Sequence, residues 1–184
     1  MSDFSDSMAK FFFEVGILSR FKRSGLDFLG TGNQNIASHI FRTAVIGYML
    51  AVADAEADEA KTALLCLFHD LPETRTGDIN QYQKNYVVKD EGRAAFDMFK
   101  GVPNPKECEG YIHEFNNGTS KEAVFARDAD VLELILTLKE EFDNGNNQAK
   151  IWINKALDRL VTQEANDIAD RVISMKSYDW WLNI

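Results

Sequence analysis

The chain has 184 residues, enough for one domain with a sizeable core, and its 45% hydrophobic and 11% aromatic content is typical of a globular protein. Its formal net charge of -9, from 29 acidic and 20 basic residues, argues against broad binding to nucleic acid or to anionic membranes. A small phosphate ester remains compatible with this charge, because a metal ion and a few local cations can dominate a pocket.

The cysteines and the apolar runs indicate the compartment. Cys66 and Cys108 fit no metal or redox spacing, and Cys66 lies in an apolar run that is typical of a buried thiol. The run at residues 11–13 is too short for a signal peptide and is followed at once by Glu14. No stretch approaches the roughly 18 apolar residues of a membrane span. We therefore expect a cytoplasmic protein without membrane contacts.

Apolar residues recur with helical spacing along most of the chain. In chain order, this periodicity predicts helices over residues 4–23, 35–53, 58–71, 89–100, 104–116, 119–142, 147–162 and 164–180. Pro72 marks the end of the third helix, and residues 74–87 are polar and irregular. Thr119 and Glu122 have capping-box spacing, and Gly145 is a C-cap candidate. Because no segment alternates with the period of a strand, we predict an all-α fold, a single compact domain over residues 1–184.

A histidine and an aspartate stand side by side where the third predicted helix ends. Successive helical positions are about 100° apart, so the side chains of His69 and Asp70 can converge on one point beside the helix. Imidazole nitrogen and carboxylate oxygen together suit Mn, Fe, Co or Zn. Such a dipeptide often arises by chance, however, and alone it does not establish a metal site.

Two further residues strengthen this interpretation. His39 lies in the apolar second helix, where a single histidine is more often an ordinary core residue. Asp130 lies in the strongly apolar helix predicted over 119–142, and a buried carboxylate there needs a partner such as a metal ion. Together the four side chains form an ordered His, His-Asp, Asp set on three apolar helices. We expect the neighbouring Asp128 to be exposed or to contact one of the metal-binding residues, without binding the metal itself. We expect His113 to be structural.

The ordered motifs resemble the HD-domain phosphohydrolases, in particular the branch that contains bacterial 5′-deoxynucleotidases and eukaryotic HD domain-containing protein 2. The resemblance covers nearly the whole chain. It is carried by Leu18-Ser19-Arg20, Ser38-His39, His69-Asp70 with Glu73, Thr76-Gly77-Asp78 with Lys84, and Ala129-Asp130. It implies that His39, His69, Asp70 and Asp130 hold one divalent metal ion (Mn, Co, Fe, Mg or Zn).

The resemblance also implies residues that contact the substrate. Glu73 matches a catalytic carboxylate, and Arg20 matches an arginine beside the scissile phosphate. Asp78 matches a carboxylate that holds the sugar hydroxyl, Lys84 a lysine of the pocket wall, and Phe21 an aromatic near the sugar or base. Without the resemblance, Glu73 is equally a solvated residue after a helix, and Arg20 is more simply a surface charge, as is Arg23.

The chain departs from the family pattern at two places. Many relatives have an acidic residue directly before the first histidine, where this chain has Ser38. Prolines that commonly follow Gly-Asp are replaced here by residues 80–83. The first departure bears on how His39 is oriented, and the second on the pocket rim and hence on substrate choice.

The reaction implied is hydrolysis of a phosphate monoester, most simply a (deoxy)nucleoside 5′-monophosphate. The metal binds a phosphoryl oxygen and activates a water, Arg20 neutralises charge, and Glu73 orients the water or passes a proton. One alternative is an HD-type hydrolase of a cyclic nucleotide, a nucleoside polyphosphate or another small phosphate. The other is a non-catalytic nucleotide sensor. We also expect a homodimer, in which Trp180 and Trp181 either pack internally or form the contact.

Overall fold

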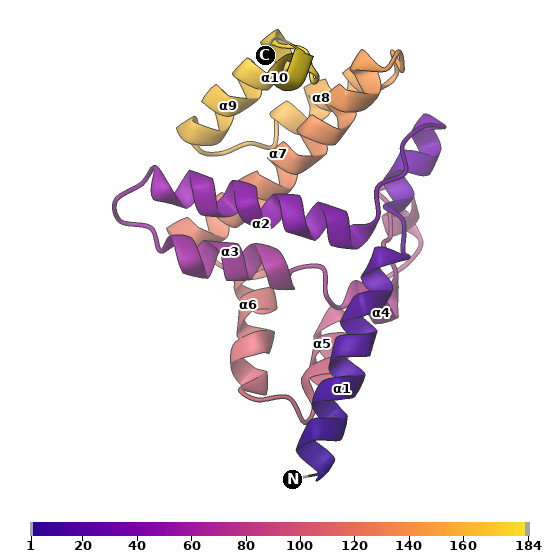
Figure 1. The fold of residues 1–184 in the computed structure, drawn as a ribbon, viewed down its shortest axis with the longest axis vertical. Coiled ribbons are helices and arrows are strands. Elements are labelled where there is room, and N and C mark those ends of the chain that lie inside the picture. Colours follow the sequence, from indigo (N-terminus) through magenta and orange to yellow (C-terminus); the bar gives the residue numbers. More distant parts are fainter. Residues whose placement is uncertain (1, 183–184) are drawn as a thin grey trace.

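The protein is a bundle of helices in a computed structural model that describes residues 2–182 (Figure 1). The α-helices are α1 (Ser2–Gly16), α2 (Ile36–Val52), α3 (Glu59–Phe68), α4 (Glu73–Thr76), α5 (Glu91–Phe99), α6 (Pro105–Asn117), α7 (Lys121–Asp143), α8 (Ala149–Leu157), α9 (Gln163–Ser174) and α10 (Asp179–Leu182). Short 3-10 turns form η1 (Ile17–Ser19), η2 (Ser24–Leu29) and η3 (Gln83–Asn85). No strand occurs within residues 2–182, so the all-α prediction is confirmed.

Helix α2 lies at the centre of the molecule, with α3 alongside it and α7 crossing both (Figure 1). Helices α8, α9 and α10 gather around the C-terminal part of α7, while α1, α5 and α6 extend to the opposite end (Figure 1). None of the described helices has the length and apolar character needed to cross a membrane. The three central helices are also those that carry the predicted metal ligands.

Small side chains let the central helices approach closely. The main core cluster contains Ala44 and Ala51 of α2 together with Ala126 and Ala129 of α7. Gly47 of α2 faces the buried thiol of Cys66 in α3, and a Cβ atom at Gly47 would lie 2.5 Å from that sulfur. The prediction that Cys66 is buried is therefore confirmed. Position 47 requires glycine because a side chain there would collide with Cys66, not because of an unusual backbone conformation.

We expect Gly47→Ala to destabilise the fold, because the added methyl group must displace Cys66 or move α2 away from α3. Overpacking of this kind costs about 1–3 kcal/mol of unfolding free energy. Gly110 of α6 is the matched control, since a Cβ there meets nothing within 4 Å. Gly110→Ala should leave stability unchanged or raise it by about 0.5–1 kcal/mol. Urea unfolding of both variants checks this, and equal stabilities would contradict the close packing.

Several predicted helix ends differ from the structure. Helix α1 ends at Gly16, not near residue 23, because the chain turns through η1 and then pairs Lys22 with Asn35 in an isolated bridge. Ser120, rather than Thr119, caps α7 by accepting a hydrogen bond from the backbone N–H of Ala123. The helix predicted over 164–180 is interrupted, and the buried Asp143 accepts a hydrogen bond from the backbone N–H of Ser177 in the interruption.

Asp128 has a structural role that the sequence did not suggest. The expectation that it is exposed is wrong, because its side chain is buried inside the molecule, and its hydrogen bonds do not involve the metal-binding residues. Its carboxylate accepts hydrogen bonds from the backbone N–H groups of Val161 and Thr162 and from the Thr162 hydroxyl. Asp128 therefore fixes the start of α9, where Thr162 is the N-cap residue.

Candidate metal centre

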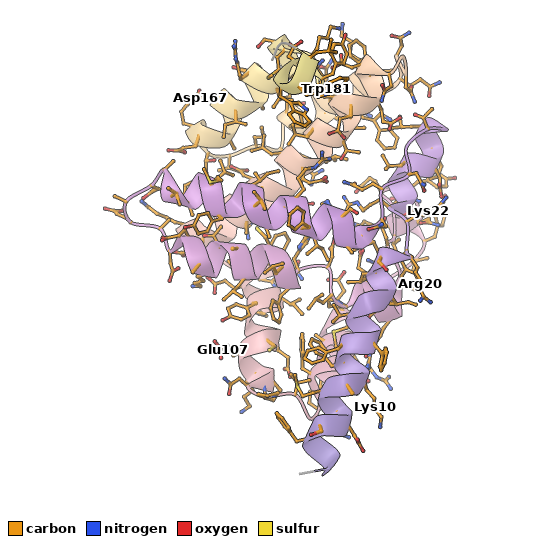
Figure 2. All side chains as sticks on the ribbon, in the orientation of Figure 1. Lys10, Arg20, Lys22, Glu107, Asp167 and Trp181 are labelled. Atoms are coloured by element: carbon orange, nitrogen blue, oxygen red, sulfur yellow. The ribbon has the colours of Figure 1, made fainter. Side chains whose placement is uncertain are left out.

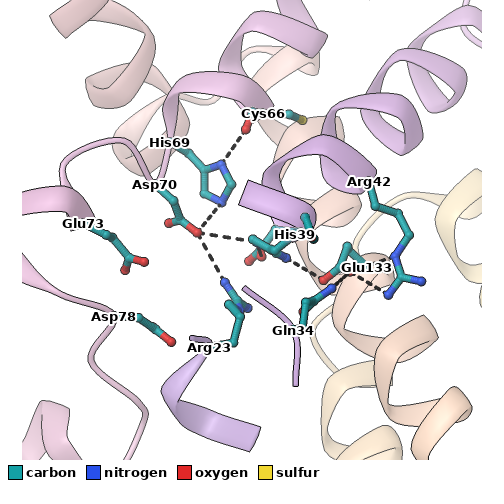
Figure 3. Close-up of polar contacts among 12 residues, drawn as sticks. Arg23, Gln34, His39, Arg42, Cys66, His69, Asp70, Glu73, Asp78 and Glu133 are labelled. Carbon is teal, nitrogen blue, oxygen red and sulfur yellow. Dashed lines mark hydrogen bonds and ion pairs between the residues drawn. The ribbon is translucent and has the colours of Figure 1, made fainter. Parts of the chain in front are cut away.

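The structure brings the four predicted ligands together from three helices. Figure 3 shows three of them, His39, His69 and Asp70. Ligand atoms of His39, His69 and Asp70 all lie within 4.8 Å of one another. Asp70 Oδ2 is 3.5 Å from His39 Nε2 and 3.1 Å from His69 Nε2. Asp130 adds its Oδ1 at 3.2 Å from His39 Nε2. His39 comes from α2, His69 and Asp70 from the end of α3, and Asp130 from α7.

Both imidazole rings are fixed through their Nδ1 atoms. His69 Nδ1 lies 2.7 Å from the carbonyl oxygen of Cys66, one turn earlier in the chain. His39 Nδ1 lies 2.5 Å from Oε2 of Glu133 on α7. A metal-binding histidine usually donates its other ring N–H to a carboxylate or a carbonyl, which selects the tautomer and the ring orientation. Each ring is therefore set so that Nε2 faces the carboxylates of the centre.

Glu133 supplies a carboxylate that orients His39, although the residue directly before His39 is Ser38 and not an acidic residue. Its side chain is fully buried and accepts hydrogen bonds from Gln34 Nε2 at 2.5 Å, Arg42 Nε at 2.8 Å and Thr137 Oγ1 at 3.1 Å. Ser38, which stands at the usual acidic position, is exposed. Glu133 was missed in the sequence, although it follows Asp130 by three positions and so shares a face of α7.

The two Nε2 atoms are the clearest sign that the centre is built for a cation. Both are buried and, within residues 2–182, neither has a hydrogen-bond partner, although carboxylate oxygens lie 3.1–3.5 Å away. A buried polar atom without a partner is costly, so such atoms are rare unless something else satisfies them. Two imidazole nitrogens facing two carboxylates make a donor set that fits a divalent first-row metal.

The electrostatics of the centre also favour added positive charge. Burial and the nearby Arg23 lower the pKa of His39, but Asp130 and Glu133 outweigh them and raise it to about 9. Burial raises the pKa of Asp70 and of Asp130, but the two histidines and Arg23 hold both values well below their usual range. The carboxylates thus stay ionised and attract a proton or another cation to this point.

Glu73 lies beside the centre at the start of α4, and it is buried. Its Oε1 accepts a hydrogen bond from Lys89 Nζ at 2.6 Å, while its Oε2 is buried and has no partner among the described residues. Burial raises the pKa of Glu73 to about 8, with further contributions from Asp70 and Asp78 that Lys89 only partly offsets. In Figure 3 its carboxylate points into the same space as those of Asp70 and Asp78.

Arg23, not Arg20, is the arginine that reaches the centre. Arg23 Nη1 lies 3.3 Å from Asp70 Oδ2, and its side chain is 19% exposed. Asp78 stands next to it, because its Oδ2 accepts a hydrogen bond from the backbone N–H of Ser24 at 2.6 Å. Arg20 is exposed beyond the end of α1 (Figure 2). The substrate role expected for Arg20 stays a prediction, and Arg23 competes for it.

The remaining predicted substrate residues lie less close to the centre. Phe21 is half-buried and packs against the core cluster around Leu18 and Ile36. Lys84 is exposed on η3, and no contact joins it to the centre within the described part of the chain. His113 is exposed on α6, and Trp181 is exposed on α10 (Figure 2).

Known proteins share this fold and its motifs. Residues 15–171 match the family model of the HD domain. Over 143 residues the chain is 26% identical to the 5'-deoxynucleotidase HDDC2 of Bos taurus. The matched region covers 74% of this chain and 69% of that protein.

Solved structures of similar proteins cover nearly the whole chain. The PH0347 protein from Pyrococcus horikoshii OT3 superposes with a TM-score of 0.76 at 26% identity, over 91% of this chain and 99% of that one. A protein from Magnetospirillum magnetotacticum MS-1, described as a predicted metal-dependent phosphohydrolase, shares the fold with a TM-score of 0.72 at 21% identity, over 92% and 90% of the two chains.

The fold, the His/Asp centre and the family match define the class of the protein. The chain belongs to the HD domain family. Its His/Asp centre is a candidate site for a divalent metal ion.

Proposed function

We propose that the protein removes phosphate from (deoxy)nucleoside 5′-monophosphates, with one divalent ion held by His39, His69, Asp70 and Asp130. The observation that carries the metal assignment is a pair of buried Nε2 atoms that face two carboxylates and have no hydrogen-bond partner among the described residues. The nucleotide assignment is supported by the similarity to the 5'-deoxynucleotidase HDDC2 and by Asp78, whose carboxylate can accept a hydrogen bond from a sugar hydroxyl.

The residues around the centre suit attack of water on a phosphate monoester. A divalent ion held by these four residues would act as a Lewis acid toward the phosphate and would make the attacking water more acidic. Arg23 is placed to neutralise charge that develops on the other phosphoryl oxygens. In its ionised form Glu73 orients the attacking water and accepts its proton through Oε2, which has no partner among the described residues.

The proposal includes the partners expected from the sequence. The substrate is a small phosphate ester rather than a nucleic acid, consistent with the net charge of -9. We further propose a cytoplasmic homodimer, for which the exposed Trp180 and Trp181 of α10 offer apolar contact surface.

A phosphate-release assay over a panel of nucleotides, repeated with Mn, Co, Fe, Mg and Zn, tests the function. We expect the highest kcat/KM with a deoxynucleoside 5′-monophosphate. Faster hydrolysis of a cyclic nucleotide or a nucleoside polyphosphate would indicate a different HD-type hydrolase. Nucleotide binding without phosphate release under any metal would indicate a sensor and would refute the proposal.

Separate replacement of Arg20 and Arg23 by glutamine tests which of the two arginines acts on the phosphate. We expect Arg23→Gln to lower kcat/KM by about 10²–10³-fold, the usual effect of removing one charge-stabilising donor. Arg20→Gln should change it only a few-fold, because Arg20 is exposed and Arg23 is at the centre. Arg93→Gln, at a side chain that is 78% exposed, controls for loss of surface charge. A larger loss of kcat/KM in Arg20→Gln than in Arg23→Gln would instead show that Arg20 acts on the phosphate.

A further inference from the structure

Lys89 reaches Glu73 from the far end of the segment that follows α4. It stands directly before Asp90, the N-cap residue of α5, sixteen positions after Glu73. Its Nζ lies 2.6 Å from Glu73 Oε1, and the two side chains are only 11% and 9% exposed. A second carboxylate, that of Glu91, is 3.8 Å from the same Nζ but is 39% exposed. The inner partner of Lys89 is therefore Glu73.

The contact leaves Glu73 with one oxygen held and the other available. Its backbone N–H is fixed by a hydrogen bond to the carbonyl oxygen of Asp70, so only side-chain rotation could carry the carboxylate away from the centre. Lys89 opposes that rotation by binding Oε1. Oε2 stays buried and has no hydrogen-bond partner among the described residues. Repulsion from Asp70 and Asp78 would otherwise favour rotation of Glu73 outward.

A purely structural role explains this contact less well. A buried ion pair seldom adds much net stability, because both charges lose their hydration. The segment between α4 and α5 is also tied down without Lys89. Asp78 binds the backbone N–H of Ser24 at one end, and the Asp90 carboxylate accepts from the backbone N–H of Arg93 at the other. The Asp90 contact only caps α5, but the Asp78 contact anchors the segment to Ser24 independently of Lys89.

We propose that Lys89 is a positioning residue, which holds the Glu73 carboxylate so that its free oxygen faces the attacking water. This inference rests on the proposed hydrolase function. Lys89 acts only through Glu73 and does not touch the substrate. The segment between α4 and α5 thereby contributes to catalysis, because Lys89 at its end positions Glu73.

A double-mutant cycle tests the proposal on purified protein loaded with metal, with metal content measured on each sample. We expect Lys89→Met to lower kcat by about 10²-fold, within the range that a general acid–base group contributes, and to change KM only a few-fold. Lys89→Arg should recover kcat to within about tenfold of the wild type, since it restores a cation opposite Glu73. Lys100→Met, at the exposed end of α5, is the charge-matched control and should behave as the wild type.

The deciding comparison is made in a Glu73→Gln background. If Lys89 acts through Glu73, adding Lys89→Met to Glu73→Gln should cost no further activity, so the two effects will not multiply. Multiplying effects would overturn the proposal, because Lys89 would then act on the substrate directly. A Lys89→Met enzyme with near wild-type kcat would overturn it as well.

A crystal structure of the Lys89→Met variant separates this inference from the proposed function. We expect the Glu73 carboxylate to turn away from the position it has in the wild type. An unmoved carboxylate would overturn the positioning role, whatever the enzyme hydrolyses. Absence of phosphate release by the wild type, in contrast, would overturn the proposed function, while the position of Glu73 would still decide whether Lys89 holds it.

Discussion

Replacement of a ligand in the centre is expected to remove the metal ion and abolish turnover. His69→Ala deletes one of the two buried Nε2 atoms, and Asp130→Ala deletes the carboxylate that α7 contributes. We expect each to weaken metal binding by more than about 100-fold, the upper range for loss of a group that only orients a ligand. Elemental analysis and calorimetric titration with the metal measure this directly.

The matched control is His113→Ala, because His113 is an exposed histidine on α6. It should retain full metal content and full activity. Asp130 is 24% exposed, so its replacement disturbs the core less than replacement of His69 and guards against a variant that fails to fold. Wild-type metal content in both ligand variants would refute the assignment of these ligands.

Replacement of Glu73 is expected to separate metal binding from catalysis. Glu73→Gln should keep the metal and the nucleotide but lower the single-turnover rate by about 10²–10⁴-fold, because the free Oε2 can no longer accept a proton. Nucleotide affinity should be equal or tighter, since a negative charge beside the phosphate is removed. Single-turnover hydrolysis of a deoxynucleoside 5′-monophosphate, with metal content measured on the same samples, provides the test.

Glu91→Gln is the control for this substitution, because Glu91 faces the same lysine from the exposed side. It should hydrolyse substrate at the wild-type rate. A near wild-type rate for Glu73→Gln at full metal occupancy would remove Glu73 from the mechanism, and with it the positioning role of Lys89.

The candidate metal centre could be predicted from the sequence because its residues interrupt apolar helices. His39, His69 and Asp130 each stand in a strongly apolar surrounding, where helical periodicity indicates burial and a polar group needs a partner. Their helices, α2, α3 and α7, have ends within three residues of the predicted ones, since burial dictates their pattern. The structure accordingly brings these side chains and Asp70 to one point.

The surrounding residues could not be assigned in the same way. Arg20 and Arg23 differ by three positions, and their placement depends on where α1 stops and on the turns that follow, which periodicity does not define. Lys89 meets Glu73 across an irregular segment, so no sequence spacing relates the two. Glu133 is different, because its spacing from Asp130 on a buried helical face did carry a usable signal.

The central claim is that hydrolysis depends on one divalent ion held by His39, His69, Asp70 and Asp130. Its most direct test is to strip the protein of metal and follow phosphate release from a deoxynucleoside 5′-monophosphate as the ion is added back. The account predicts no release from the stripped protein and a rate that rises with bound metal until it saturates at one ion per chain. Unchanged phosphate release from protein whose metal has been removed, verified by elemental analysis, would contradict it.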